Sequence, residues 1–182
     1  LIQALAATGL KRIQIVSFVH RRLVPQMADA EEICRRVPPV PALSYTGTYL
    51  NVEGLNRALE TRLVDVKGKV SRTASETFAG KNLNRSLKED LAMQHKMARI
   101  YKDQGIPITH GTIMAAFGCN YEGIIPLDRL LAFIDSLVTL ANHYRSTLHT
   151  LMLADTMGWA NPEQIRTTIR EIRSRWPDIH LG

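Results

Sequence analysis

The segment LHTLMLADTMGWANPEQIRTTIREIRSRW (residues 148–176) decides the fold of this chain. It opens with the apolar run Leu148 to Ala154, which predicts a buried strand. A short polar loop follows, and Asn161-Pro162 then supplies an N-cap and a first-turn proline for a helix. The segment is therefore one strand–loop–helix unit, with its polar side chains directly after the carboxyl end of the strand.

The same unit recurs along the rest of the chain. Strands are expected to begin near residues 12, 42, 64, 108, 147 and 179, with a helical segment between each strand and the next. This alternation predicts a parallel α/β sheet, and the pattern alone fits both a closed barrel and an open doubly wound sheet. The better-defined strands are Ala42 to Tyr49, Val64 to Ser71, Ile108 to Ala116 and Leu148 to Ala154; the helices are 28–37, 51–60, 86–104, a long helix from Pro126, and a helix after Asn161 with Ile165, Ile169 and Ile172 facing inward.

Composition limits the class of protein. The chain has 182 residues, of which 45% are hydrophobic and 22% charged, which is typical of a globular domain with a real core. No stretch approaches the roughly 18 apolar residues of a membrane span, and no secretory signal pattern is present. The only two cysteines, Cys34 and Cys119, fit a reducing compartment better than a disulfide framework. We expect one domain over residues 1–182, in the cytoplasm or alternatively the mitochondrial matrix.

The positive charge is dispersed. Lys and Arg number 23 against 17 Asp and Glu, for a net charge of +6, but no basic run exceeds two residues and only 6% of residues are aromatic. A nucleic-acid binder normally concentrates its basic residues and places aromatic ones among them. The pattern therefore indicates a solvated surface that can attract an anionic substrate, with no nucleic-acid or membrane partner.

Four segments concentrate polar residues directly after expected strands. In parallel α/β folds, ligands lie beyond the carboxyl ends of the strands, so these segments are the candidate site. They are SFVH with VPQMAD (17–20 and 24–29), SETF with KN (75–78, 81 and 82), GCNYEG (118–123) and ADTMG (154–158).

In these four segments, in this order and spacing, the chain resembles the hydroxymethylglutaryl-CoA lyase family, which is built on a (β/α)8 TIM barrel. A complete barrel needs about 250 residues. The resemblance therefore implies an incomplete TIM barrel with about five complete strands, lacking the first strand and the last two.

The resemblance also implies a reaction, namely cleavage of the C2–C3 bond of a 3-hydroxyacyl-CoA into an acyl-CoA and a keto product. A divalent cation, Mg²⁺ or Mn²⁺, would orient the substrate while a base and an acid move protons. The family's metal ligands would lie outside this chain, so no metal ligand is expected within it. An acyl-CoA substrate and a homo-oligomer are implied as partners, although the residues themselves leave the oligomeric state, the metal and the exact acyl group open.

Individual residues match the family's site. Asp155 matches the aspartate that takes part in proton transfer, Thr156 a substrate contact beside it, and Ser17 a substrate-contacting serine. The alternative for Asp155 and Thr156 is that they cap a turn. Cys119 is expected to pack under the site, because the family's catalytic cysteine lies on a loop beyond this chain.

Three substrate-facing positions depart from the family. Gln14 replaces a glutamate, Met152 replaces a serine, and Thr112 replaces a tyrosine. An amide cannot hold negative charge or accept a proton as a carboxylate does, so the charge around the site must differ. These changes predict an altered substrate pocket and leave the identity of the acyl group open.

The remaining basic and histidine residues are weaker candidates. Some could bind anionic substrate groups but are expected at the solvated surface, and three histidines have no spacing typical of a metal site. The first group is His20, Arg21, Arg22, Lys81 and Arg85; the second is His110, His143 and His149. Two other functions remain open: a Claisen-type condensing enzyme of the same superfamily, and a degenerate barrel that binds or scaffolds without catalysis.

Overall fold

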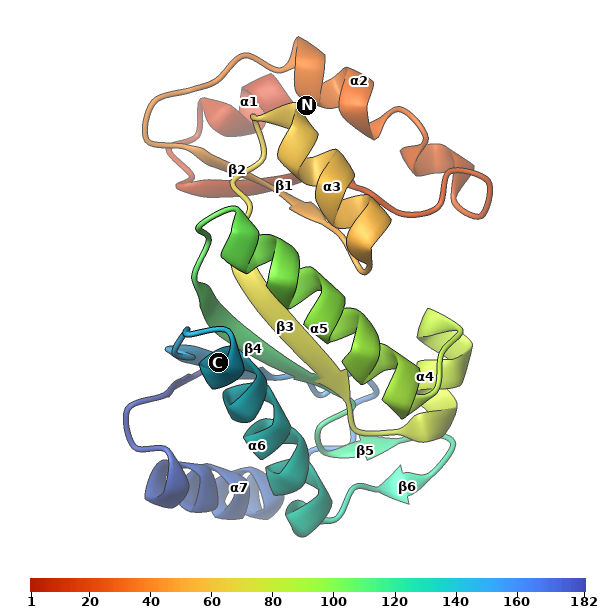
Figure 1. Cartoon of the computed structure of the whole chain (residues 1–182), viewed down its shortest axis with the longest axis vertical. Coiled ribbons are helices and arrows are strands. Elements are labelled where there is room, and N and C mark those ends of the chain that lie inside the picture. Colours follow the sequence, from red (N-terminus) through yellow and green to blue (C-terminus); the bar gives the residue numbers. More distant parts are fainter. The chain divides into compact units, whose positions relative to one another are not determined.

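The computed structural model describes all 182 residues and divides them into two compact units, Leu1–Val66 and Lys67–Gly182 (Figure 1). None of the helices combines the length and the apolar character that a bilayer-spanning segment requires. Cys34 and Cys119 are both free and buried.

The first unit is a pair of parallel strands with short helices. Strands β1 (Arg12–Ser17) and β2 (Ser44–Thr48) pair in parallel, so that Gln14 lies beside Thr46 and Ser17 beside Thr48. Buried Leu55 and Ala58 on the last helix contribute to its core. The helices are α1 (Ile2–Ala6), a 3-10 turn (Pro25–Met27), α2 (Ala30–Arg36) and α3 (Val52–Thr61).

A three-residue ion cluster lies on the surface of this unit. Arg57 donates from Nε and Nη2 to the carboxylate of Glu31 and from Nη1 to the carbonyl oxygen of Val19, at 2.9 Å for the last. Arg21 adds a second cation 3.1 Å from Glu31. The hydrogen bonds from Arg57 lower the pKa of Glu31 to about 2, although partial burial opposes the shift.

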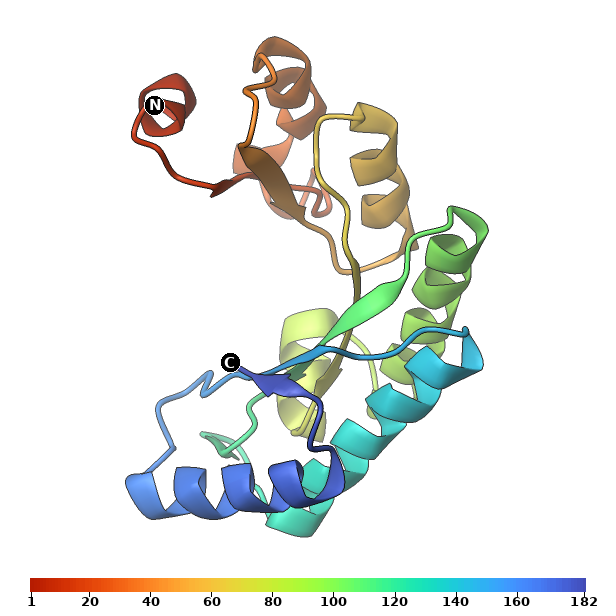
Figure 2. The same ribbon diagram turned by 90° about the vertical axis from the view of Figure 1, so that its left-hand side faces the viewer.

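The second unit contains a four-stranded parallel sheet in the order β3-β4-β7-β8. Helices α5 and α6 lie along one face of this sheet (Figures 1 and 2). A short antiparallel hairpin, β5 with β6, follows β4. The bounds are β3 (Gly68–Thr73), α4 (Glu76–Leu83), α5 (Leu87–Asp103), β4 (Ile108–Met114), β5 (Gly118–Cys119), β6 (Gly123–Ile124), α6 (Leu127–His143), β7 (Thr150–Leu153), α7 (Pro162–Arg175) and β8 (His180–Leu181).

Local sequence explains where these helices begin. Ser86 and Glu89 form a capping box at the start of α5, and Asn161 accepts the N–H of Gln164 at the start of α7. Helix α6 buries an apolar stripe over most of its length. Arg72 on β3 and Asp90 on α5 are both buried, with Nε of Arg72 3.9 Å from Oδ2 of Asp90. The guanidinium of Arg72 also lies over the ring of Phe133 on α6. Burial raises the pKa of Asp90.

Several expectations need correction. The strand predicted from Val64 to Ser71 begins only at Gly68, because Val64 forms a single bridge to Tyr45 of the first unit. The strand predicted to Ala116 stops at Met114, because Ala115 has a left-handed φ of 52° that no strand continues through. On α7, Ile165 is 37% exposed and Thr168 is buried in its place. Helix α4 and the β5–β6 hairpin were not predicted.

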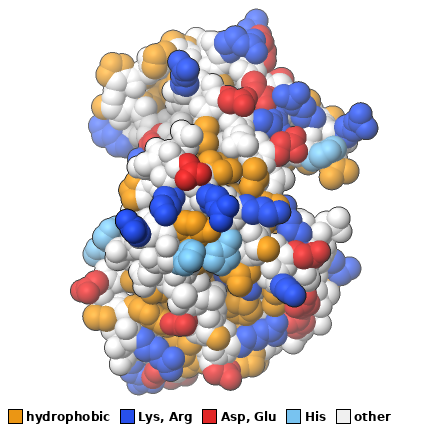
Figure 3. Space-filling view, viewed as in Figure 1, with side chains coloured by type: hydrophobic (Ala, Val, Ile, Leu, Met, Phe, Trp, Pro, Cys, Tyr) orange, Lys and Arg blue, Asp and Glu red, His pale blue; other side chains and the backbone are white.

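The face that Figure 3 presents carries charged side chains of both signs, including a row of basic ones across its middle. Figure 3 shows acidic side chains interspersed among basic ones on the face that it presents. Histidine side chains gather over α5 and α6, where the rings of His95 and His143 meet edge to face with centroids 5.9 Å apart. Burial lowers the pKa of His95, and His143 lowers it further.

Candidate functional site

The site lies at the carboxyl ends of β3, β4 and β7. These strands are neighbours in the sheet, so the loops that follow them meet at one edge. Three of the four polar segments singled out from the sequence are on these loops, in the second unit. The fourth segment, after β1, belongs to the first unit, where Gln14 is exposed and Ser17 is half-buried.

Asp155 stands two residues after β7 and is exposed. Its Oδ1 accepts the N–H of Trp159 at 2.8 Å, and its Oδ2 accepts the N–H of Ala160 at 3.1 Å. The side chain therefore caps its own loop, as the alternative interpretation expected. Each carboxylate oxygen can accept a second hydrogen bond, so the same geometry leaves acceptor sites for another molecule.

Thr156 joins the ends of two strands. Its Oγ1 accepts the N–H of Ala115 at 2.9 Å, and next to it the N–H of Ala116 donates to the carbonyl oxygen of Ala154 at 3.0 Å. These bonds satisfy backbone donors exactly where β4 has ended. Thr156 is therefore occupied in holding the β4 and β7 loops together.

A second connection between these loops runs through Trp159. Its Nε1–H donates to Oδ1 of Asn120 at 2.8 Å, and the N–H of Asn120 donates to Sδ of Met157 at 3.1 Å. The ring lies against Gly118, where an added Cβ would stand 2.5 Å from Cγ of Trp159. A glycine is therefore required at 118 for the ring to occupy this place.

Glu122 connects the loops after β3 and β4. Its Oε1 accepts the hydroxyl of Ser75 at 2.8 Å and the N–H of Thr77 at 2.7 Å, while its Oε2 lies 3.1 Å from Nη1 of Arg129. Partial burial raises the pKa of Glu122, but these donors outweigh it and hold the pKa below its usual range. The resemblance implied only that Tyr121, Glu122 and Gly123 shape the loop after β4, and it predicted none of these partners; the available signal was an acidic residue shortly before a helix that carries Arg129.

Cys119 lies under these loops, as expected. Its side chain is fully buried, and its thiol donates to Oγ of Ser75 at 3.1 Å. The N–H of Tyr121 donates in turn to Sγ at 3.4 Å. Cys119 therefore supports the Ser75–Glu122 contact from below.

Two of the three departures from the family pattern are neighbours. Thr112 on β4 pairs in register with Met152 on β7 and, on its other side, with Ser71 on β3. Met152 is 51% exposed, whereas Thr112 is half-buried. The two side chains therefore share one face of the sheet, and a change at one position alters the surroundings of the other.

Four of the weaker candidates have other contacts. Arg21 pairs with Glu31, and Lys81 lies 5.1 Å from the ring centroid of Tyr121. Nδ1 of His110 lies 2.8 Å from Oγ1 of Thr109, and the ring of His143 contacts Tyr144 edge to face. No group of three or more His, Cys, Asp or Glu side chains in the chain is arranged to hold a metal ion. The residues present therefore do not fit a divalent cation by themselves.

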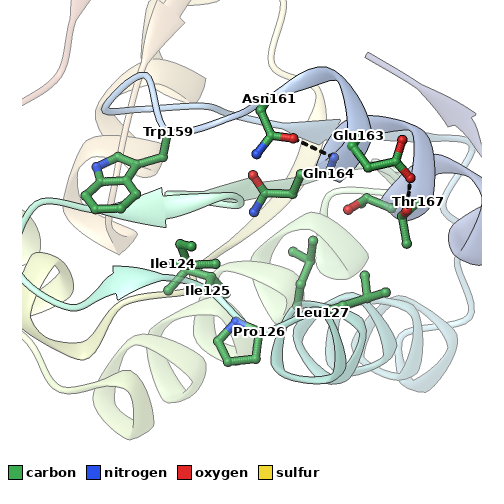
Figure 4. Close-up of a pocket in the computed structure, with 11 residues that line it drawn as sticks. Ile124, Ile125, Pro126, Leu127, Trp159, Asn161, Glu163, Gln164 and Thr167 are labelled. Atoms are coloured by element: carbon green, nitrogen blue, oxygen red, sulfur yellow. Dashed lines mark hydrogen bonds between the residues drawn. The ribbon is translucent and has the colours of Figure 1, made fainter.

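A pocket of about 440 Å³ opens beside the loop of Asp155, between the starts of α6 and α7 (Figure 4). One wall is apolar, with Ile124, Ile125 and Leu127, and Trp159 lies at its edge. The α7 side is polar, and Gln164 there donates to the carbonyl oxygen of Phe117 at 2.8 Å. The pocket includes none of the site residues predicted from the sequence.

A parallel sheet with a linked set of polar loops at its carboxyl edge defines the class of α/β enzymes that bind ligands at that edge. Comparison with known proteins is more specific. The model of the HMGL-like family matches residues 1–181, and the chain belongs to this family.

Similar proteins include hydroxymethylglutaryl-CoA lyase YngG of Bacillus subtilis, 30% identical over 178 residues, which are 97% of this chain and 56% of that protein. The cytoplasmic 3-hydroxy-3-methylglutaryl-CoA lyase of Rattus norvegicus is 30% identical over 97% of this chain and 49% of its own length. The chain thus spans about half the length of the curated relatives it matches.

Solved structures of HMG-CoA lyases have the same fold over nearly the whole of this chain. The HMG-CoA lyase of Bacillus subtilis superposes with a TM-score of 0.82 at 30% identity, covering 99% of this chain and 58% of that one. The HMG-CoA lyase of Acinetobacter baumannii, solved with coenzyme A and 3-methylmalate, gives a TM-score of 0.78 at 26% identity, covering 99% and 56%. The expected fold is confirmed: the chain is part of a TIM barrel.

Proposed function

We propose that this chain is part of a carbon–carbon lyase of the hydroxymethylglutaryl-CoA lyase type, which cleaves a 3-hydroxyacyl-CoA into an acyl-CoA and a keto product. The observation that carries the proposal is Asp155. Its exposed carboxylate is fixed by two backbone N–H groups at the carboxyl end of β7, within a chain that belongs to the HMGL-like family. The single incomplete barrel over residues 1–182 is part of the same proposal.

The reaction needs one proton removed and one returned. A base takes the proton of the C3 hydroxyl, C3 becomes a carbonyl carbon, and the electron pair of the C2–C3 bond passes to C2 beside the thioester. An acid then protonates C2. Asp155 is the proposed proton-transfer residue, because each of its oxygens keeps an acceptor position after binding the loop backbone.

The substrate is proposed to be a 3-hydroxyacyl-CoA. A related lyase was solved with coenzyme A, which supports the thioester class. Ser17 and Thr156 are proposed substrate contacts, although Thr156 reaches substrate only with the oxygen that already accepts the N–H of Ala115. Thr112 and Met152 together, with Gln14, are proposed to set the acyl specificity.

A divalent cation, Mg²⁺ or Mn²⁺, is proposed for the whole enzyme, with ligands from outside this chain. When bound, it would polarise the oxygens of the substrate. We also propose a cytoplasmic location, since two free thiols fit a reducing compartment, and a homo-oligomer, which analytical ultracentrifugation would test.

The test is an assay of the protein at its full natural length. A panel of 3-hydroxyacyl-CoA thioesters is offered with Mg²⁺ or Mn²⁺, and both the acyl-CoA and the keto product are measured. Cleavage of at least one thioester, lost in Asp155→Asn and retained in Asp135→Asn on the exposed side of α6, supports the proposal. Absence of cleavage with every thioester, or an unaffected Asp155→Asn variant, rejects it; condensation of an acyl-CoA with an oxo acid instead would identify a condensing enzyme.

A further inference from the structure

We infer that Trp159 is a positioning residue for Asp155, acting through Asn120 and Gly118 on the neighbouring loop. The inference rests on the proposed function, in which Asp155 transfers a proton. It assigns a task to a side chain that sequence reasoning had not singled out.

The loop that carries Asp155 is bonded largely to itself. Besides the two bonds to the carboxylate, the N–H of Gly158 donates to the carbonyl oxygen of Asp155 at 3.3 Å. The direction of the carboxylate therefore follows the backbone at Trp159 and Ala160. Any shift of that backbone moves both carboxylate oxygens.

The side chain of Trp159 ties this backbone to the loop after β4. Its indole N–H reaches Asn120 at 2.8 Å, and its ring covers Gly118 so closely that no Cβ could be placed there. The same residue thus binds Asp155 with its backbone and the β4 loop with its ring. The other ties to segment 115–120 come from Ala154, Thr156 and Met157, which precede the backbone donors to the carboxylate, and from Gln164 on α7, which follows them.

Burial does not by itself account for the place of this tryptophan. Trp159 is 37% exposed at the edge of the pocket in Figure 4, so much of its apolar surface still contacts water. Its polar contact to Asn120 and its fit over Gly118 are therefore the specific restraints. A misplacement of about 1 Å can cost a reaction about 100-fold, so a looser Asp155 loop should slow turnover without abolishing binding.

The test uses single and double variants of the full-length protein. Trp159→Phe keeps a ring over Gly118 but removes the N–H donor, and Asn120→Ala removes its acceptor. Each is expected to lower kcat about tenfold and to change KM less than about twofold. The double variant should be no slower than either single one, because both remove the same hydrogen bond. Trp176→Phe, at the other tryptophan of the chain, is the matched control and should leave kcat unchanged.

A second measurement does not depend on activity. The indole ¹H–¹⁵N resonance of Trp159, assigned by its loss in Trp159→Phe, should move in Asn120→Ala, together with the amide resonances of Trp159 and Ala160. If these amides do not move, or if Trp159→Phe keeps kcat within about twofold of wild type, the inference is wrong even in an active lyase. If the resonances respond but wild type cleaves no thioester, the proposed function fails while the link between Asn120 and the Asp155 loop stands.

Discussion

Glu122 and Asp155 lie on neighbouring loops at the same edge of the sheet, yet their carboxylates are used differently. Glu122 accepts from Ser75 and Thr77 on one oxygen and pairs with Arg129 on the other. Asp155 has no charged partner and accepts only one backbone N–H on each oxygen. The carboxylate of Glu122 stabilises the loops that it joins. The carboxylate of Asp155 is held in place by its own loop and keeps acceptor positions for a ligand.

We interpret this difference as one between a structural carboxylate and the proposed reactive one. A carboxylate with an arginine partner and several donors stabilises the loops it joins, and its charge is already balanced. A carboxylate oriented by backbone N–H groups alone is fixed in direction but keeps acceptor capacity. Activity should therefore depend on Asp155, and stability should depend on the paired carboxylates.

The largest effect is expected at Asp155 itself. Asp155→Asn keeps the shape but cannot take a proton, so kcat should fall at least about 100-fold. The amide oxygen can still accept one of the two backbone N–H groups, but the NH₂ group cannot accept the other. The free energy of unfolding should therefore fall by about 1 kcal/mol or less. Steady-state kinetics and urea unfolding measure the two effects. A variant that loses stability more than activity would reverse the comparison with Glu122.

The next largest effect, on the free energy of unfolding, is expected at Glu31, the paired carboxylate of the first unit. Its folded pKa is about 2, below the ordinary 4.5, so its contribution is fully present above pH 4.5 and is lost as the pH falls toward 2. Glu31→Gln should cost about 2 kcal/mol at pH 7, discounted for partial exposure. The gap from wild type should close between pH 4.5 and 2 in urea unfolding. Glu32→Gln, on the exposed side of α2, is the control; an equal loss there would show that any acidic residue of the helix has this effect.

Glu122→Gln should have a smaller effect on stability. The amide keeps one acceptor oxygen but loses the charge that Arg129 and the Thr77 N–H favour, at a cost of about 1–2 kcal/mol. Since its folded pKa is lowered, the difference from wild type should shrink as the pH falls below 4.5. Thermal unfolding at pH 7 and pH 4 measures this. A gap that widens at the lower pH would contradict the assigned direction.

The smallest effect is expected at Cys119. Cys119→Ala removes a buried sulfur and its weak contacts to Ser75 and Tyr121, at about 1 kcal/mol. Ser75 keeps its bond to Glu122, so activity should remain within about twofold of wild type. A far larger loss of kcat would give the thiol a role in the reaction that the structure does not indicate.

Much of the fold could be predicted because the sequence signals of each strand–helix unit lie close together in the chain. The capping box at Ser86, the Asn161-Pro162 pair and the stripe on α6 all depend on residues within a few positions of one another. The misplaced start of β3 has the opposite origin. Val64 is as apolar as a strand residue should be, but it forms only an isolated bridge to Tyr45. That pairing depends on tertiary contacts, which the local sequence does not encode.

The site could be predicted in its position but not in its connections. The polar segments after β3, β4 and β7 were predicted at the carboxyl ends of strands, and the order of the strands in the sheet then brings their loops together. The hydrogen bonds from Trp159 to Asn120 and from Ser75 to Glu122 join residues 39 and 47 positions apart. No local pattern encodes such pairs, so they appear only once the loops are built.

The close approach of Trp159 to Gly118 has a consequence for how this protein can change over generations. A side chain of any size at 118 excludes the indole, and a small residue at 159 leaves an empty space over Gly118. A lineage that replaces either residue alone passes through a poorly packed intermediate. We therefore expect positions 118 and 159 to be exchanged as a pair among descendants of this sequence, with a larger residue at 118 accompanied by a smaller one at 159.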